Sequence, residues 1–237
     1  MERYVYPLSL VLVALINFAL AVKLQLGTRE YARYPIYRRT RILTTVWLTV
    51  FGIGYLLHAI FGFRFSCPAI ATALTTTCFH VGAICFSWGY TSLLDPNYLT
   101  RRVVIRDLLI YAIGVVCYWT VALTWREEPF YATIATAIFF LYAAYGTFIF
   151  YRTYNLVSLE TIKITNGSVS SFAHWMQLCC DLIILFGIGC VALVAIFPNT
   201  VWTYIVLCWL SPVVYGYIFR SLDKYGTVVK ATAKDKE

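Results

Sequence analysis

Residues Lys23 to Arg41 read KLQLGTREYARYPIYRRTR, a stretch with six basic side chains and one acid, Glu30. It separates two long apolar runs, one that ends at Val22 and one that begins at Ile42. Membrane insertion tends to leave short loops rich in lysine and arginine on the cytoplasmic side. We therefore expect this loop to lie in the cytosol, which sets the direction of every later segment.

The composition of the 237 residues is that of an integral membrane protein. Apolar residues make up 61%, aromatic residues 18% and charged residues only 13%, and the mean hydropathy is +0.73. Soluble domains have about 25% charged residues. Six uncharged runs contain between 18 and 38 residues, and a helix needs about 20 apolar residues to cross the hydrocarbon core. Because Pro198-Asn199 supplies a turn within the longest run, we expect seven spans.

The sequence therefore predicts an all-α integral membrane protein, a seven-transmembrane-helix bundle that forms one domain over residues 1–226. The spans are expected at about 5–23, 42–63, 68–94, 104–125, 129–151, 172–197 and 201–220, with a short polar cytoplasmic tail at 227–237. In this topology 16 of the 19 basic residues lie in the cytosol, and Arg3, Arg64 and Arg126 lie outside. The distribution predicts an N-terminus outside and a C-terminus in the cytosol, and the charge of +8 does not indicate a nucleic-acid partner.

The alternative for the first span is a cleavable signal peptide, because Ala19-Leu20-Ala21 resembles a cleavage site. Cleavage there would leave the six-charge loop at an outer N-terminus and spoil the charge distribution of everything downstream. We therefore expect the first span to be retained.

Motifs for catalysis and for metal binding are missing from the sequence. It contains no HExxH, GxSxG or glycine-rich phosphate loop, and its eight cysteines form no CxxC. The three histidines include His58 near one membrane face and His174 near the other, so they cannot share a metal ion. The last span has no lysine for a retinal Schiff base. We expect no metal, no cofactor and no catalytic residue, and an intramembrane enzyme is only a third hypothesis.

Polar side chains inside the apolar runs are the candidate functional residues, because such groups are expensive in hydrocarbon. At 1.5 Å per residue, Asp181 lies about 13 Å and His80 about 12 Å from the inner face. Asn17 and Ser211 fall near the same depth. A buried carboxylate needs a partner, and His80 is the natural one for Asp181. The alternative is that these four groups only bond helices to one another.

One face of the sixth span is also polar. His174, Gln177 and Asp181 are spaced i, i+3 and i+7 and so share a helix face that runs from the inner surface to the polar layer. This pattern fits a hydrated track, and it fits equally a polar stripe that packs against neighbouring helices.

The last span carries a local resemblance to a receptor motif. Ser211-Pro212-x-x-Tyr215 resembles the NPxxY motif of G-protein-coupled receptors, in which the proline permits a kink and the tyrosine moves on activation. The sequence departs from that family because no Asp-Arg-Tyr closes the third span and Cys67 has no cysteine partner in an outer loop. The resemblance implies that Pro212 and Tyr215 form a moving element.

The whole chain resembles the multi-span N-terminal sensor regions of membrane-bound regulators in Bacteroides-like bacteria, which precede AraC-type DNA-binding or histidine-kinase domains. The similarity lies in the turn from Asp95 to Arg102 and in the exit from the last span, Tyr215 to Gly226. Such regulators would continue where this sequence ends, 11 residues after Gly226. The resemblance implies a detached sensor module in a bacterial cytoplasmic membrane that acts through a cytoplasmic signalling partner.

Two functions from different classes follow as expectations. The first is a receptor-like signalling module. In it a small-molecule or lipid ligand binds within the bundle, and the resulting rearrangement is transmitted to the basic cytoplasmic loops. The second is a small transporter or proton-coupled carrier that uses Asp181 and His80.

Overall fold

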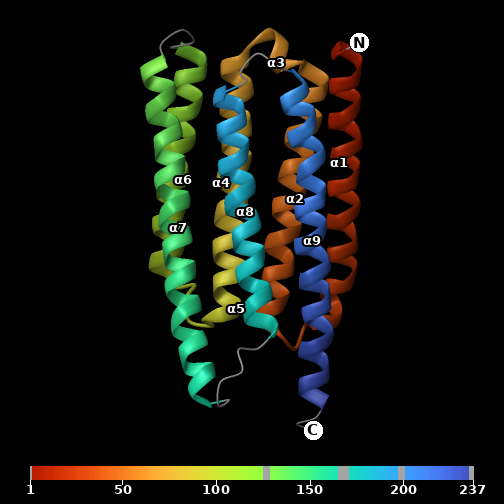
Figure 1. The fold of residues 1–237 in the computed structure, drawn as a ribbon, viewed down its shortest axis with the longest axis vertical. Helices are drawn as coiled ribbons and strands as arrows, with labels where there is room; N and C mark the ends of the chain where they lie inside the picture. Colours follow the sequence, from red (N-terminus) through yellow and green to blue (C-terminus); the bar gives the residue numbers. More distant parts are fainter. Residues whose placement is uncertain (1, 125–128, 165–170, 197–200, 235–237) are drawn as a thin grey trace.

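The computed structural model describes residues 2–124, 129–164, 171–196 and 201–234, and nearly all of them are helical. Seven long helices among these residues run roughly parallel, as Figure 1 shows, with the two chain ends at opposite ends of the bundle. The expected turn at Pro198-Asn199, the expected span ends at 125 and 197 and the last three residues of the tail lie outside the described residues.

The helices begin and end where the local sequence favours it. The long ones are α1 (Glu2–Gly27), α2 (Pro35–Phe61), α4 (Pro68–Phe86), α6 (Arg101–Thr124), α7 (Pro129–Ile164), α8 (Ser171–Ile196) and α9 (Val201–Lys234). The short ones are the 3₁₀ helix η1 (Thr28–Tyr31), α3 (Phe63–Ser66), the π-helix η2 (Ser87–Thr91) and α5 (Ser92–Leu94). Proline stands in the first turn of α2 and α4, where its missing N–H costs nothing. Gly62 ends α2 in the left-handed conformation that favours glycine.

Five helical segments among the described residues are long and apolar enough to cross a membrane. They are Tyr4–Tyr31, Pro35–Phe61, Pro68–Leu94, Arg101–Thr124 and Val201–Gly226. A shorter apolar segment, His174–Gly187, lies in α8. The all-helical class predicted from composition is confirmed, and the five segments indicate a multi-pass membrane protein.

Two helices extend further than the spans expected from hydropathy. The structure continues α7 to Ile164 and α9 to Lys234, so part of the expected loop after residue 151 and most of the expected polar tail are helical. The apolar run sets only the minimum length of a helix. Between Arg152 and Ile164 no glycine or proline interrupts the chain, so the helix continues into polar sequence.

The helices pack in a defined order across the bundle. Helix α1 contacts α2 and α9, α2 contacts α4, α4 contacts α6, α6 contacts α7, and α8 contacts α9. Figure 1 accordingly shows α1 at one side, α4 and α8 in the middle, and α6 and α7 at the other side. We call the end of the bundle that holds residues 28–41, the start of α6 and Asp223 the basic end.

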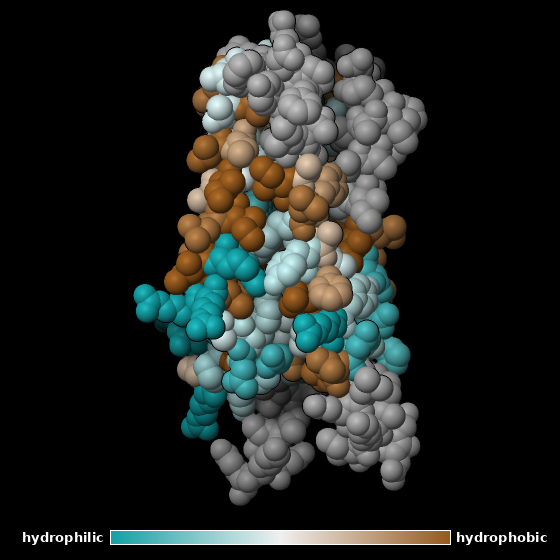
Figure 2. Space-filling model, turned by 90° about the vertical axis from the view of Figure 1, so that its left-hand side faces the viewer, coloured by the Kyte–Doolittle hydropathy of each residue, from teal (hydrophilic) through white to brown (hydrophobic). Residues whose placement is uncertain are grey.

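The outer surface near α6 and α7 is strongly apolar. Exposed side chains of α6 include Leu109, Ile113 and Val116, which are 58–65% exposed. Figure 2 shows hydrophobic residues over the middle of this face and hydrophilic residues toward the basic end. A helix that exposes such residues in water would be costly, whereas lipid accommodates them.

Threonine hydroxyls of α4 are satisfied locally. The four threonines of α4 donate to the carbonyl oxygen four residues earlier at 2.7–2.9 Å, and they are Thr72, Thr75, Thr76 and Thr77. Such bonds remove the cost of an unpaired hydroxyl in hydrocarbon. These side chains therefore do not by themselves mark a polar pathway.

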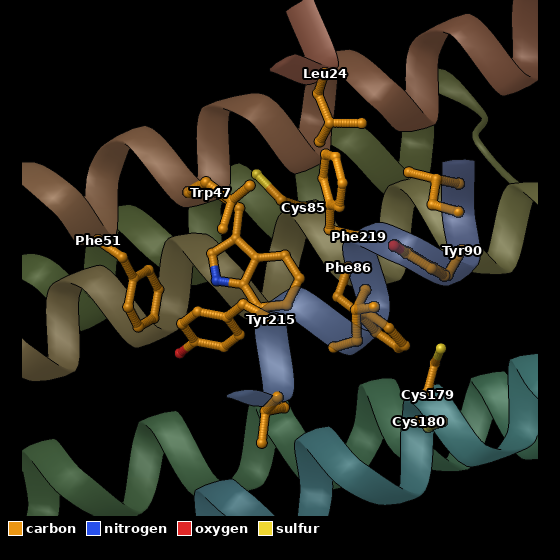
Figure 3. Close-up of a cluster of buried hydrophobic side chains, with 14 of the residues drawn as sticks. Leu24, Trp47, Phe51, Cys85, Phe86, Tyr90, Cys179, Cys180, Tyr215 and Phe219 are labelled. Atoms are coloured by element: carbon orange, nitrogen blue, oxygen red, sulfur yellow. The ribbon is translucent and has the colours of Figure 1, made fainter. Parts of the chain in front are cut away.

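The largest core cluster joins α1, α2, α4, η2, α7, α8 and α9, and Figure 3 shows part of it. Aromatic rings dominate it. Trp47 and Phe51 of α2 meet Tyr215 of α9, while Phe86 of α4 stacks on Tyr90 of η2 with ring centroids 4.5 Å apart. Aromatic pairs of this kind contribute about 1 kcal/mol each beyond the burial of their area.

Candidate functional site

A cavity of about 450 Å³ lies among α2, α4, α7, α8 and α9. Aromatic, aliphatic and glycine residues form almost all of its wall. The lining residues are Trp47, Phe51, Phe79, Gly82, Ala83, Phe86, Ser87, Phe139, Phe140, Tyr142, Ala143, Ala144, Gly146, Thr147, Phe148, Phe150, Cys180, Ile183, Ile184, Phe186, Gly187 and Tyr215. None of them carries a formal charge. Small-molecule sites occupy about 300–1,000 Å³ and are mostly apolar, so this cavity has the size and the lining of such a site.

Three aromatic rings from α2 and α9 form one wall of the cavity. The ring centroid of Tyr215 lies 5.0 Å from that of Trp47 and 5.3 Å from that of Phe51, in edge-to-face geometry. Figure 3 shows the three rings gathered between the two helices. Phe186 of α8 approaches the same tyrosine from across the cavity at 5.9 Å. Tyr215 therefore links α9 to both α2 and α8.

Glycines set the shape of the cavity. A Cβ on Gly82 would lie 2.8 Å from the indole nitrogen of Trp47 and 3.0 Å from the ring of Phe51, so α4 and α2 approach closely only because this residue has no side chain. A Cβ on Gly146 or Gly187 would meet nothing within 4 Å. The cavity is therefore closely packed toward α2 and unfilled toward α7 and α8.

Ser211 and Pro212 act together in α9. Proline at 212 has no N–H to donate to the carbonyl of Cys208, four residues earlier. The hydroxyl of Ser211 donates to that carbonyl at 2.8 Å, and the hydroxyl of Tyr55 in turn donates to Ser211 at 2.8 Å. Ser211, predicted as a candidate site residue, thus donates the hydrogen bond to the Cys208 carbonyl that Pro212 cannot donate.

Asn17 is fully buried in α1 and bonds locally. Its side-chain amide donates to the carbonyl of Val13 at 2.9 Å, while its oxygen has no hydrogen-bond partner among the described residues. No hydrogen bond joins Asn17 to any of the other predicted site residues in the described structure. Asn17 therefore has no hydrogen bond to the rest of the polar layer expected from depth.

His80 lies on the side of α4 that faces α6 and α7. Its side chain is fully buried, and its Nδ1 lies 3.4 Å from the hydroxyl of Tyr118, which is the upper limit of a hydrogen bond. Four aromatic rings surround it with centroids 4.8–6.2 Å away, and they belong to Tyr111, Tyr118, Phe139 and Tyr142. Its Nε2 has no hydrogen-bond partner among the described residues.

Asp181 lies half-buried in α8 and accepts a hydrogen bond from the hydroxyl of Tyr151 in α7. It does not line the cavity, although its neighbour Cys180 does. Along the predicted polar face, Gln177 is half-buried and His174 is exposed. The three residues share a face of α8 as their spacing requires.

The expected pairing of Asp181 with His80 is wrong. The two side chains have different partners: Asp181 accepts from Tyr151 of α7, whereas His80 lies beside Tyr118 of α6, and no hydrogen bond or ion pair joins the two in the described part of the chain. Depth along the helix axis was estimated from the sequence, but the direction of a side chain around that axis depends on which helices are neighbours. Each of the two ionisable groups therefore contacts a tyrosine in place of the other.

Sequence reasoning missed two buried charges at the basic end. It placed Arg41 in the basic cytosolic loop and did not single out Asp107, but both side chains are only 1–2% exposed. Their sequence signal was their position within the first two turns of a long helix, where a bundle can still enclose them. The aromatic wall around Trp47 was also missed, because nothing in an apolar run shows which aromatic residues border a cavity.

Arg41 joins three helices at the basic end. Its guanidinium donates to the carbonyl of Leu24 in α1 at 2.9 Å, to the hydroxyl of Tyr37 at 3.1 Å and to the carboxylate of Asp223 in α9 at 3.0 Å. The hydroxyl of Tyr37 donates to the carbonyl of Leu222 at 2.8 Å. These bonds hold the end of α9 against α1 and α2.

Asp107 is the centre of a second polar cluster, beside the π-helix. It accepts hydrogen bonds from the indole of Trp88 at 2.7 Å and from Arg106 at 2.8 Å. The π-turn shifts the register of the helix, and such turns occur often at functional sites. The hydroxyls of Ser87 and Tyr98 lie 2.9 Å apart in the same region, and burial raises the pKa of Tyr98 above its usual value.

Comparisons of the chain with protein-family models, with curated proteins and with solved structures found no match. The described residues also contain no group of three or more histidine, cysteine, aspartate or glutamate side chains placed to hold a metal ion. The cavity and the two polar clusters at the basic end are therefore the features from which a function can be argued.

Proposed function

We propose that this chain is a seven-span membrane sensor that binds an uncharged, mostly apolar small molecule in the cavity between α4, α7 and α8. In this proposal α7 and α8 also cross the membrane, and the basic end lies in the cytosol. The length of both helices and the crowding of arginine and lysine at one end support this topology. The preferred partner on the cytosolic side is a separate signalling protein.

The observation that carries the proposal is the composition of the cavity wall. About 450 Å³ is bounded by side chains without formal charge, and Tyr215 forms part of the wall three residues after Pro212. A bound molecule would fill the space toward α7 and α8 and press on the rings that join α2 to α9. A proline inside a helix removes one backbone hydrogen bond and is a common place for bending.

A direct route leads from the cavity to the basic end. Tyr215 and Asp223 belong to the same helix, and the rise of a helix puts them about 12 Å apart along its axis. Asp223 bonds to Arg41, and the preceding carbonyl of Leu222 accepts from Tyr37. Bending of α9 at the cavity therefore changes contacts that hold the basic end together.

The carrier hypothesis receives less support from the geometry. It required Asp181 and His80 to act together at a hydrated cavity, but the two residues have different partners and neither lines the cavity. A charged substrate would also have to replace its hydration with an apolar wall, which is costly.

Benzophenone is a suitable probe for the test, because it is uncharged, apolar and forms covalent bonds with nearby C–H groups under ultraviolet light. The protein in lipid nanodiscs is irradiated with it, and the labelled peptides are identified by mass spectrometry. We expect labelling of peptides that line the cavity. Hydrogen exchange of backbone amides in α9, measured with and without the probe, should change near Pro212.

Two glycines supply a matched pair of variants. Gly187→Leu places a side chain in the cavity, whereas Gly216→Leu places the same side chain in open space on α9, outside the cavity lining. We expect labelling and the change in α9 to be lost only in Gly187→Leu. Equal labelling of both variants would refute the cavity as the site, and labelling without any change in α9 would refute the signalling role.

A further inference from the structure

The indole N–H of Trp47 is a buried donor at the wall of the cavity. The side chain is 3% exposed, it lines the cavity, and its Nε1 has no hydrogen-bond partner among the described residues. Most buried donors in folded proteins have a hydrogen-bond acceptor, so a buried donor without one needs an explanation. Here the donor borders an empty space large enough for a ligand.

Two other tryptophans show how the same fold treats an indole outside the cavity. Trp88 donates its N–H to Asp107 at 2.7 Å, and Trp119 donates to the hydroxyl of Thr77 at 3.2 Å. Neither lines the cavity. Of these three indoles, the one without a hydrogen-bond partner is the one that lines the cavity, and α4 can approach it closely because Gly82 has no Cβ, which would lie 2.8 Å from Nε1.

We propose that the cavity selects an apolar molecule with one hydrogen-bond acceptor, such as a carbonyl or ether oxygen, and that this oxygen accepts the N–H of Trp47. The inference rests on the proposed function and names the ligand class for the same cavity. The absence of any formal charge on the lining residues makes the ligand uncharged. Its remaining surface contacts the aromatic and aliphatic wall.

The depth of Trp47 favours a free molecule over a phospholipid of the surrounding bilayer. Helix α2 runs from Pro35 to Phe61, but its part within the hydrocarbon is expected to begin at Ile42, so the rise of a helix puts Trp47 about 8 Å inside the inner edge of the hydrocarbon core. The ester carbonyls of phospholipids lie at that edge, so a lipid carbonyl would have to enter the core by about 8 Å to reach the indole.

Benzophenone and diphenylmethane differ in the presence of a hydrogen-bond acceptor. Both have two phenyl rings, but only benzophenone has a carbonyl oxygen. A benzene molecule fits a cavity of about 150 Å³, so a two-ring molecule needs about 300 Å³, less than the cavity provides. The affinity of benzophenone is measured by photolabelling and that of diphenylmethane by its competition with the label, each corrected for partition into the same nanodiscs.

The variants isolate the hydrogen bond from the apolar contacts. In the unaltered protein we expect benzophenone to bind about three- to tenfold more tightly than diphenylmethane, which is the effect of one net hydrogen bond. Trp47→Phe should abolish this preference while both molecules still bind. Trp119→Phe removes an indole whose N–H is already bonded to Thr77 outside the cavity, and it should leave the preference intact.

Each other outcome has a definite meaning. Binding of both molecules without preference in the unaltered protein would overturn the inference and leave the proposed cavity function standing, with the N–H satisfied by the ring of Tyr215. A preference that persists in Trp47→Phe would overturn the assignment of Trp47. Binding of neither molecule to folded protein would overturn the proposed function itself.

A change of lipid distinguishes the two sources of a carbonyl. In nanodiscs of ether-linked phospholipid, which has no ester carbonyl, we expect the same ratio of affinities as in ester-linked phospholipid. A ratio that rises only in the ether lipid would mean that an ester carbonyl of the bilayer already occupies Trp47, and it would overturn the choice of a free molecule.

Discussion

Gly226 is the residue at which the packing of the basic end can be tested most sharply. It lies in α9 next to two tyrosines of the α1–α2 connection and of α2. A Cβ at this position would overlap the hydroxyl of Tyr37 and would lie 2.7 Å from the hydroxyl of Tyr31. Gly226→Ala therefore requires Tyr37 to move or α9 to shift away from α2.

The cost follows from the contacts of Tyr37. Its ring is 3% exposed and is held between those of Tyr31 and Tyr225, with centroids 4.6 and 5.7 Å away, so it cannot simply rotate. Moving it breaks the bonds to Leu222 and Arg41, each worth about 1 kcal/mol. Overpacking adds about 1–3 kcal/mol, and the better helix propensity of alanine returns about 1 kcal/mol. We expect the free energy of unfolding to fall by about 2–4 kcal/mol.

The assay is reversible unfolding in mixed micelles with increasing dodecyl sulfate, followed by far-ultraviolet circular dichroism. Gly216→Ala is the matched control, because it makes the same change in the same helix where a Cβ meets nothing within 4 Å. It should be neutral or stabilising by up to about 1 kcal/mol. In a Tyr37→Phe background, which lacks the overlapping hydroxyl, Gly226→Ala should cost clearly less. If the two alanine variants unfold alike, the described packing of α9 against Tyr37 is wrong.

Two further predictions concern charge and topology. Asp107 is only 1% exposed and accepts from both Trp88 and Arg106. Asp107→Asn should therefore lower the free energy of unfolding by about 2 kcal/mol in the same assay. Asp181→Asn should lower the free energy of unfolding by less than about 1 kcal/mol, since an amide oxygen can still accept from Tyr151. Similar decreases for the two variants would contradict the assignment of Asp107 as the buried charge. An epitope tag placed after Glu237 should be reached by antibody in inverted vesicles and not in intact cells, and the reverse result would contradict a cytosolic basic end.

The clearest difference between expectation and structure concerns Arg41. In the sequence it closes a basic stretch and looks like the other cations of the loop. In the structure the Arg41 side chain is only about 2% exposed and bonds to α1 and α9. Its neighbour Arg38, by contrast, is exposed on the surface of α2. The distinction depends on α9, a helix far later in the chain, arriving beside α2.

The resemblance of Ser211-Pro212-x-x-Tyr215 to a receptor motif was local, and the structure shows a local role for its serine. Ser211 bonds to the carbonyl of Cys208, which the proline leaves free. The partner of Tyr215 was not predictable, because an aromatic residue in an apolar run fits equally against lipid, a helix or a cavity. The structure places it against Trp47 and Phe51.

The sequence by itself determined that the chain is helical and multi-pass, because the length of an apolar run and the residues that start or stop a helix are local properties. It also determined which polar groups lie within the runs. Only the tertiary structure decided which way each side chain faces around its helix axis. For this reason His80 and Asp181 do not meet, and Arg41 and Asp107 are buried. For the same reason a cavity with an unpaired indole donor remains between α2 and α8. That direction depends on the neighbouring helices, and their choice is made by packing between segments far apart in the chain.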